Sequence, residues 1–510
     1  MPTSAPRATA VLTVLVAALL VVAACSSTGD ESADPGGSGG SAGTAAPAPT
    51  GTGTTTPAAV ERPNIVVIMT DDQTVEQLRV MGRTTELLGE GGTTFERSFV
   101  AYSECCPSRA TFLTGQHHAN HGVLSSSLPF GGVTKLDATD TLPVWLDDAG
   151  YWTSFTGKYL NGYGEDAPPD VPPGWDSWWG LVDPTTYQAY EYTVDQDGEL
   201  RTYGARPEDH TTDVMGAHVV DEIRHRADEP EPFFIWFNPV APHGLRQDLA
   251  GGYTVPRPTP RNKGTLGDEP APSGPAVTET DLSDKPAFLV ERAEVGSTAP
   301  ASWYRRALES LVDVDEWVGA IEEVLVETDQ LDDTIIIFTS DNGFMYGEHG
   351  IPTGKLVHYE PSTRVPLLVA GPGIPRGEVR DQLVSNVDLA PTIAELAGVD
   401  PGLVVDGRSW LPVLRDPDAG QGRYLLLQSG PHRGRRTFDA IRGERYKLVR
   451  HSTGERELYD LVTDPDELES RHDDPALADV AADLERRLDV LVGCAGESCW
   501  MQGSPEQPDD

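Results

Sequence analysis

The chain has 510 residues, which is enough for one large α/β domain or two ordinary domains. Its hydrophobic content of 38% and charged content of 23% allow a substantial buried core. The 80 Asp and Glu residues outnumber the 38 Lys and Arg residues, so the negative field argues against nucleic acid and anionic lipid as general partners.

Residues 1–25 have the pattern of an export signal. Arg7 precedes the apolar run 10–24, which is too short to span a membrane comfortably as a helix. The run ends in Val22-Ala23-Ala24-Cys25, which resembles the bacterial lipoprotein box, in which Cys25 is lipidated. We therefore expect an extracytoplasmic protein attached to the bacterial cell membrane only through this lipid. Secretion with an incidental cysteine is the alternative.

Composition divides the rest of the chain. Residues 26–62 are rich in Gly, Ser, Thr and Pro and predict a flexible linker. A large domain is expected over 63–420, a smaller subdomain of antiparallel strands and one helix over 421–495, and an acidic tail over 496–510. Within the large domain, the Pro- and Gly-rich segment 246–300 is interpreted as a rim or lid.

Four stretches rich in apolar residues predict strands, at 65–69, 233–237, 334–339 and 365–373, and the first is a continuous apolar run typical of a buried strand. Segments with helical spacing, such as 303–328, lie between them. This alternation predicts an α/β fold with a large, mostly parallel mixed sheet flanked by helices.

Polar pairs follow two of these strands. Asp71 and Asp72 come after the first, and Asp341 and Asn342 after the third. A single Asp at a strand end is usually a turn former or a helix cap. Two such pairs at the carboxyl ends of similar strands favour oxygen ligands for a divalent cation.

The cysteines separate into groups. Cys494 and Cys499 lie close enough in sequence to predict a local disulfide in an oxidising compartment. Cys105 and Cys106 are adjacent and cannot readily bridge each other.

The run CCPSRATFLTG, residues 105–115, resembles the Cys-x-Pro-Ser-Arg-x-x-x-Leu-Thr-Gly signature of type I sulfatases. The resemblance implies an alkaline-phosphatase-like fold and hydrolysis of a sulfate ester. It also implies that a formylglycine-generating enzyme oxidises Cys105 to formylglycine. One hydroxyl of the hydrated aldehyde would attack sulfur, and the other would then lose its proton so that sulfate is expelled. Cys106 falls at the variable position and is interpreted as a small buried hydrophobe.

The same resemblance assigns further residues to the site. Asp71, Asp72, Asp341 and Asn342, with the modified residue 105, correspond to the metal ligands. Ca²⁺ is the expected ion and Mg²⁺ the alternative. The family's motifs also imply an active-site role for each of the following: Arg109, Lys158 in FTGKYLNGYG, His243 in APHG and Lys355 in TGKLVHYE.

One departure concerns the base that helps to release sulfate. Many sulfatases have Gly-Lys-Trp-His, whereas this chain has Gly157-Lys158-Tyr159-Leu160-Asn161, similar to N-acetylglucosamine-6-sulfatases and heparan 6-O-endosulfatases. Asn161 cannot act as a base, so His121 and His243 are the candidates. Asn342 is a second departure, because the glucosamine-6-sulfatase branch often has His at that position.

We therefore expect a sulfatase whose substrate is a sulfated sugar or an aryl sulfate, with no nucleic-acid partner. The alternatives are a phosphodiester or phosphonate monoester hydrolase of the same superfamily, and a lipoprotein that binds a sulfated ligand without turnover. A basic cluster could dock an anionic chain locally or form a solvated strand face; it consists of Arg433, Arg435, Arg436, Arg442, Arg445, Lys447 and Arg450.

Overall fold

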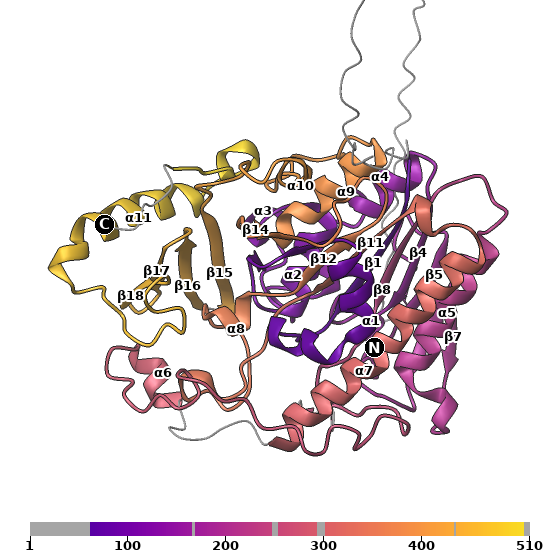
Figure 1. The fold of residues 1–510 in the computed structure, drawn as a ribbon, viewed down its shortest axis with the longest axis horizontal. Helices are drawn as coiled ribbons and strands as arrows, with labels where there is room; N and C mark the ends of the chain where they lie inside the picture. Colours follow the sequence, from indigo (N-terminus) through magenta and orange to yellow (C-terminus); the bar gives the residue numbers. More distant parts are fainter. Residues whose placement is uncertain (1–61, 166–168, 247–252, 293–300, 433–434, 504–510) are drawn as a thin grey trace, which may run out of the picture. The chain divides into compact units, whose positions relative to one another are not determined.

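The computed structural model describes residues 62–165, 169–246, 253–292, 301–432 and 435–503. A ten-stranded mixed sheet forms the centre of the large domain (Figure 1). In spatial order its strands are β13 (Glu378–Arg380), β2 (Thr93–Phe95), β12 (Leu367–Ala370), β11 (Thr334–Ser340), β1 (Asn64–Thr70), β8 (Phe233–Asn238), β4 (Trp152–Gly157), β5 (Ser177–Leu181), β6 (Thr193–Gln196) and β7 (Glu199–Thr202). The five central strands, from β11 to β5 in this order, are parallel to one another. The pairs β11–β12, β5–β6 and β6–β7 are antiparallel.

Helices cover both faces of this sheet, which explains why β1, β8 and β11 consist mainly of apolar residues. Ile65 and Val67 of β1 pack with α2 (Cys105–Thr114), α4 (Leu142–Asp148) and α9 (Leu389–Ala397). Val66 and Ile68 pack on the other face, with residues of α5 (Thr211–His225) and α7 (Ala301–Glu327). The four predicted strands and the helix expected at 303–328 are confirmed.

A second sheet of four antiparallel strands lies toward the C-terminus. Its strands are β15 (Leu425–His432), β16 (Arg435–Arg442), β17 (Tyr446–His451) and β18 (Arg456–Asp460). Helix α11 (Ala478–Leu491) packs on it through Leu484 and Leu488. The expected fold class is therefore confirmed, and so is the disulfide between Cys494 and Cys499.

Short elements complete the described chain. Two small strand pairs are β3 (Ser98–Phe99) with β14 (Val384–Ser385), and β9 (Leu245–Arg246) with β10 (Tyr253–Thr254). The remaining α-helices are α1 (Gly82–Thr84), α3 (His118–His121), α6 (Ala287–Arg292), α8 (Glu360–Thr363) and α10 (Leu411–Arg415).

A buried carboxylate joins the C-terminal sheet to the large domain. Glu457 of β18 accepts hydrogen bonds from His358 Nε2 (2.8 Å), His451 Nε2 (2.6 Å) and the hydroxyl groups of Tyr359 and Tyr459. Four donors satisfy its two oxygens, so burial of this charge is offset by hydrogen bonding. His358 lies three residues after Lys355, so this contact anchors the segment that carries Lys355.

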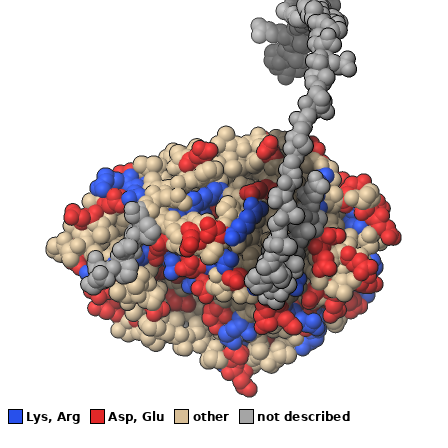
Figure 2. Space-filling view, turned by 45° about the horizontal axis from the view of Figure 1, so that its top comes forward, with Lys and Arg blue, Asp and Glu red and all other residues tan. Residues whose placement is uncertain are grey.

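The basic cluster expected on the C-terminal sheet is mostly neutralised. Its members with described side chains pair with carboxylates: Arg442 with Glu360, Arg445 with Asp460, Lys447 with Glu467, and Arg450 with Asp489. Lys447 is fully buried, which a solvated strand face does not explain. Over one face of the molecule, acidic and basic side chains are interspersed (Figure 2). The charges of these four residues are therefore paired within the protein, with Arg442, Arg445 and Lys447 largely buried and Arg450 at the surface.

Several predictions fall outside the described residues. They concern the export signal, the lipidation of Cys25, the linker up to residue 61 and the last seven residues of the acidic tail. Within the described part of the chain, no helix combines the length and hydrophobicity needed to cross a membrane.

Candidate active site

The parallel pairing of β1 with β11 brings the two polar pairs together. Thr70 lies opposite Ser340 at the ends of these strands, so the two residues after each strand continue side by side. The Asp341 amide donates to Thr70 O (3.0 Å), and the Asp72 amide to Asp341 Oδ1 (3.4 Å). Asp72 has φ of 71°, an unusual conformation for a non-glycine residue and one that is concentrated at functional sites.

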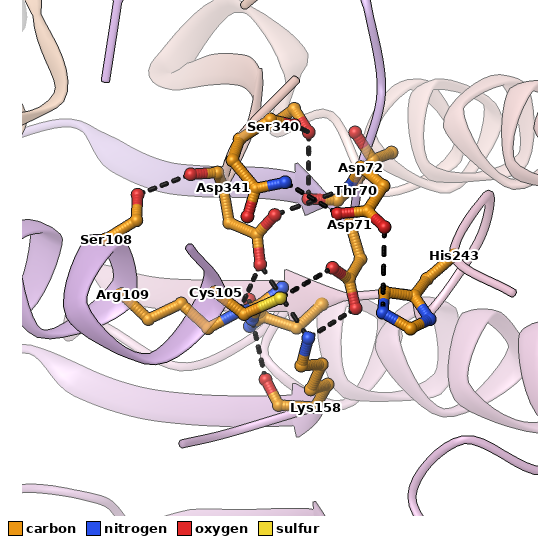
Figure 3. Close-up of polar contacts among 12 residues, drawn as sticks. Thr70, Asp71, Asp72, Cys105, Ser108, Arg109, Lys158, His243, Ser340 and Asp341 are labelled. Carbon is orange, nitrogen blue, oxygen red and sulfur yellow. Dashed lines mark hydrogen bonds and ion pairs between the residues drawn. The ribbon is translucent and has the colours of Figure 1, made fainter. Parts of the chain in front are cut away.

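Helix α2 directs the side chains of Cys105 and Arg109 toward the carboxylates at the strand ends. Cys105 is the first residue of the helix and Arg109 lies one turn later, so both side chains share a face (Figure 3). The Cys105 thiol donates to Asp71 Oδ1 (3.2 Å). The buried Arg109 guanidinium donates to Asp341 Oδ2 (2.8 Å), Lys158 O (2.7 Å) and Asn238 Oδ1 (2.8 Å). Arg109 therefore ties three strand ends to the helix.

Strand β4 positions Lys158 directly after its last residue, Gly157. A Cβ atom at Gly157 would lie 2.0 Å from Asn238 O, and its φ of 113° also favours glycine. This close approach lets the Lys158 amide donate to Asn238 O (2.9 Å). The buried ammonium group of Lys158 contacts Asp71 Oδ2 and lies 3.8 Å from Asp341 Oδ2.

Lys355 and His243 approach from two loops. Lys355 Nζ donates to Cys105 Sγ (2.8 Å) and Asn342 Oδ1 (3.3 Å), and it also contacts Asp72 Oδ1. His243 Nε2 lies 3.6 Å from Asp72 Oδ2. His243 Nδ1 is 2.6 Å from Gly244 O, so Nδ1 carries a proton and Nε2 faces the site.

Opposite charges favour the ionised forms of Asp71 and Lys158. Burial alone would raise the pKa of Asp71, but Lys158, His243, Lys355 and Arg109 outweigh it and hold the pKa well below its usual value. Burial would lower the pKa of Lys158, but the nearby carboxylates raise it. By contrast, burial raises the pKa of the Cys105 thiol, with Asp341 and Asp71 adding to the effect.

The donor set fits a hard divalent cation. Ligand atoms of Asp71, Asp72, Cys105 and His243 all lie within 4.8 Å of one another. Asp341 and Asn342 stand beside them, and all four strand-end side chains are at most 3% exposed. Three buried carboxylates and an amide oxygen are ligands that suit Ca²⁺ or Mg²⁺. The residues that could hold such an ion are Asp71, Asp72, Asp341 and Asn342.

The two supporting residues suggested by sequence have different positions. His121 lies beside α2, where its Nε2 is 3.1 Å from Thr111 Oγ1 and its Nδ1 accepts from the Val123 amide. It is not in the group of ligand atoms that contains His243. Asn161 Nδ2 donates to the hydroxyl of Tyr187 (2.8 Å), which in turn lies beside His243. Of the two candidate bases, the structure brings only His243 to Asp72.

Sequence reasoning missed two neighbours of the site. Asn238 ends β8 and accepts from Arg109, so the strand-end rule that selected Asp71 could have found it. Tyr187 lies in the loop between β5 and β6, where no motif marks it. Cys106 is fully buried in the core on the α2 side of the sheet, away from the solvent.

Comparison with known proteins identifies the family. The family model "Sulfatase" matches residues 63–399, and the model "N-sulphoglucosamine sulphohydrolase, C-terminal" matches residues 347–492. The chain is 33% identical over 512 residues to an arylsulfatase of Volvox carteri, covering 89% of this chain and 78% of that protein. It is 30% identical over 502 residues to N-acetylglucosamine-6-sulfatase of Homo sapiens, covering 88% and 87% respectively.

The fold also matches a solved structure. A protein solved in complex with its substrate D-glucosamine-2-N,6-O-disulfate superposes with a TM-score of 0.67 at 24% identity, covering 84% of this chain and 97% of that one. This likeness shows a shared fold. Because the first family model spans most of the chain and the relatives align along most of their own length, the chain belongs to the sulfatase family of sulfuric ester hydrolases.

Proposed function

We propose that this sulfatase hydrolyses a sulfate ester on a sulfated carbohydrate and uses formylglycine formed from Cys105. The placement of Cys105 carries the proposal: it stands between the carboxylate of Asp71 and the ammonium group of Lys355. The likeness to N-acetylglucosamine-6-sulfatase and to the complex with a sulfated glucosamine favours a 6-O-sulfated glucosamine unit as the substrate.

The residues around Cys105 suit a sulfate group. A hydrated formylglycine would supply the hydroxyl that attacks sulfur, and a divalent cation would lower the pKa of that hydroxyl and neutralise sulfate oxygens. The ammonium group of Lys355 contacts Cys105 Sγ, and that of Lys158 contacts Asp71, the carboxylate that Cys105 also contacts. Both ammonium groups would bind the sulfate oxygens. Arg109 makes no contact with solvent and acts by fixing Asp341 and the backbone of Lys158.

His243 is the group proposed to move protons. Its Nδ1–H is held by Gly244 O, so Nε2 points to the cluster and can donate to the leaving alcohol or accept a proton when sulfate departs. His121 is engaged with Thr111 and Val123, and the amide of Asn161 has no basic atom. These contacts favour His243 over His121.

The reaction class can be tested with paired chromogenic esters. Protein matured with a formylglycine-generating enzyme should hydrolyse p-nitrophenyl sulfate with a kcat/KM well above that for p-nitrophenyl phosphate and the phosphodiester. It should also release sulfate from N-acetylglucosamine 6-sulfate, measured by ion chromatography. A clear preference for the phosphodiester would contradict the sulfate assignment, and sulfate release from aryl sulfates alone would contradict the sugar assignment.

Metal removal is expected to stop turnover, because a cation is needed to balance Asp71, Asp72 and Asp341 around a bound sulfate. Treatment with EDTA should lower kcat by on the order of 10²-fold or more, and Ca²⁺ should restore it better than Mg²⁺. The Asn342→Ala variant should need at least 10-fold more free Ca²⁺ for half-maximal activity, a size typical of weakened metal sites. Activity that resists EDTA in protein shown by elemental analysis to be metal-free would rule out the cation.

A further inference from the structure

We infer that the ring of Tyr187 is a positioning element that aligns Lys158 and His243, two residues from different strand ends. Tyr187 lies between β5 and β6 and is 3% exposed. The ammonium nitrogen of Lys158 lies 4.8 Å from the centre of its ring. The His243 ring packs on it with centroids 4.5 Å apart and planes 35° apart. One aromatic side chain therefore contacts both groups.

The chemistry of each contact explains why an aromatic ring is suited to this position. The negative face of the ring attracts an ammonium group, and this attraction is stronger when the ion is removed from water. Lys158 is 1% exposed, so its ammonium group is removed from water. Its charge partners are the carboxylates of Asp71 and Asp341. The ammonium group therefore has two kinds of partner, the carboxylates of the proposed metal site and the ring of Tyr187. The contact with the tilted His243 ring would limit the rotation of that ring away from Asp72.

The hydroxyl group of Tyr187 makes a contact of its own, in addition to those of the ring. It accepts a hydrogen bond from Asn161 Nδ2 (2.8 Å), and Asn161 lies three residues after Lys158. This bond attaches the loop that contains Tyr187 to the segment that follows β4. Asn161, which stands near the position where many sulfatases have a histidine, thereby supports the ring instead of exchanging protons. The ring makes the contacts to the active site, whereas the hydroxyl makes one hydrogen bond between two segments.

This assignment predicts different effects for removing the ring and removing the hydroxyl. Tyr187→Leu should lower kcat about 30-fold, the size expected for losing a desolvated cation–π contact, with KM changed less than about threefold. Tyr187→Phe keeps the ring and should stay within about threefold of the parent in both constants. If Tyr187→Leu folds poorly, Tyr187→Met is the alternative, because methionine fills more of the space without supplying a ring. The same loss of kcat is expected for it.

Tyr190 supplies a matched control in the same loop. Its ring also packs against a histidine, His210, at 5.2 Å, and lies under a cation, Arg257, at 4.4 Å. Tyr190→Leu removes the same kind of contacts away from the active site, so it should reduce thermal stability without lowering kcat. An equal loss of kcat in Tyr190→Leu and Tyr187→Leu would show that general loosening is responsible.

A double variant separates positioning from structure. If Tyr187 acts through Lys158 and His243, the 30-fold effect of Tyr187→Leu should shrink to a few fold in a Lys158→Ala background. A folded Tyr187→Leu protein with kcat within threefold of the parent would overturn the inference. The inference rests on the proposed roles of Lys158 and His243. If those roles were wrong, the single variants Lys158→Ala and His243→Ala would retain full activity, which separates that outcome from a wrong role for Tyr187.

Discussion

Replacing Cys105 with alanine should abolish sulfate ester hydrolysis while leaving the fold intact. The thiol contacts Asp71 and Lys355, but both charges keep other partners, because Asp71 still pairs with Lys158 and Lys355 with Asp72. No charge is therefore left uncompensated by the change. Activity toward p-nitrophenyl sulfate should fall to background, and the thermal unfolding midpoint should move by no more than a few degrees.

Cys106→Ala is the matched control, since it makes the same change in the encoded sequence one residue away. Its thiol is fully buried in the core, so the variant should lose about 1 kcal/mol of stability and retain kcat. Loss of activity in a stable Cys106→Ala protein would contradict this division between the two cysteines. Mass spectrometry of the peptide containing Cys105 supplies the second check. An intact thiol in active protein from the native host would rule out formylglycine.

The central strands could be predicted because burial on both faces leaves an unbroken apolar run. Ile65, Val66 and Val67 show this pattern, and helices cover both of their faces. Strand β4 was not predicted. Its buried Thr153, Ser154 and Thr156 interrupt the apolar pattern, although the strand lies between β8 and β5. The partners of each strand were also not predictable, because pairing joins residues about 270 positions apart, as in β1 with β11.

The candidate site also contains residues that could be predicted from sequence and residues that could not. Residues in strand-end pairs or family motifs, such as Asp341 and Lys158, could be predicted because their positions follow from local sequence. Tyr187 could not be predicted, because its role depends on a loop folding back onto two other strand ends. The sequence also left open whether His121 or His243 is the base, and in the structure His121 Nε2 lies 3.1 Å from Thr111 Oγ1. The surroundings of Tyr187 and of His121 both depend on how the chain folds in space, which local sequence does not show.

Lys355→Ala is expected to lower kcat on the order of 10²-fold or more, because it removes a preorganised donor from the place where negative charge develops. Its ammonium group reaches Cys105 Sγ, Asn342 Oδ1 and Asp72 Oδ1 from a loop anchored by the buried carboxylate of Glu457. The position of this group is therefore fixed before substrate arrives. Steady-state kinetics with p-nitrophenyl sulfate would measure the loss.

The split between kcat and KM shows when Lys355 acts. A lysine that only attracts the sulfate anion would bind the ground state and the transition state equally, and its removal would raise KM alone. That result would contradict the proposed role. Lys285→Ala is the control, since Lys285 is also buried and pairs with Asp284 outside the active site. Breaking that pair should cost about 3 kcal/mol of stability without lowering kcat, because no reacting charge lies beside it.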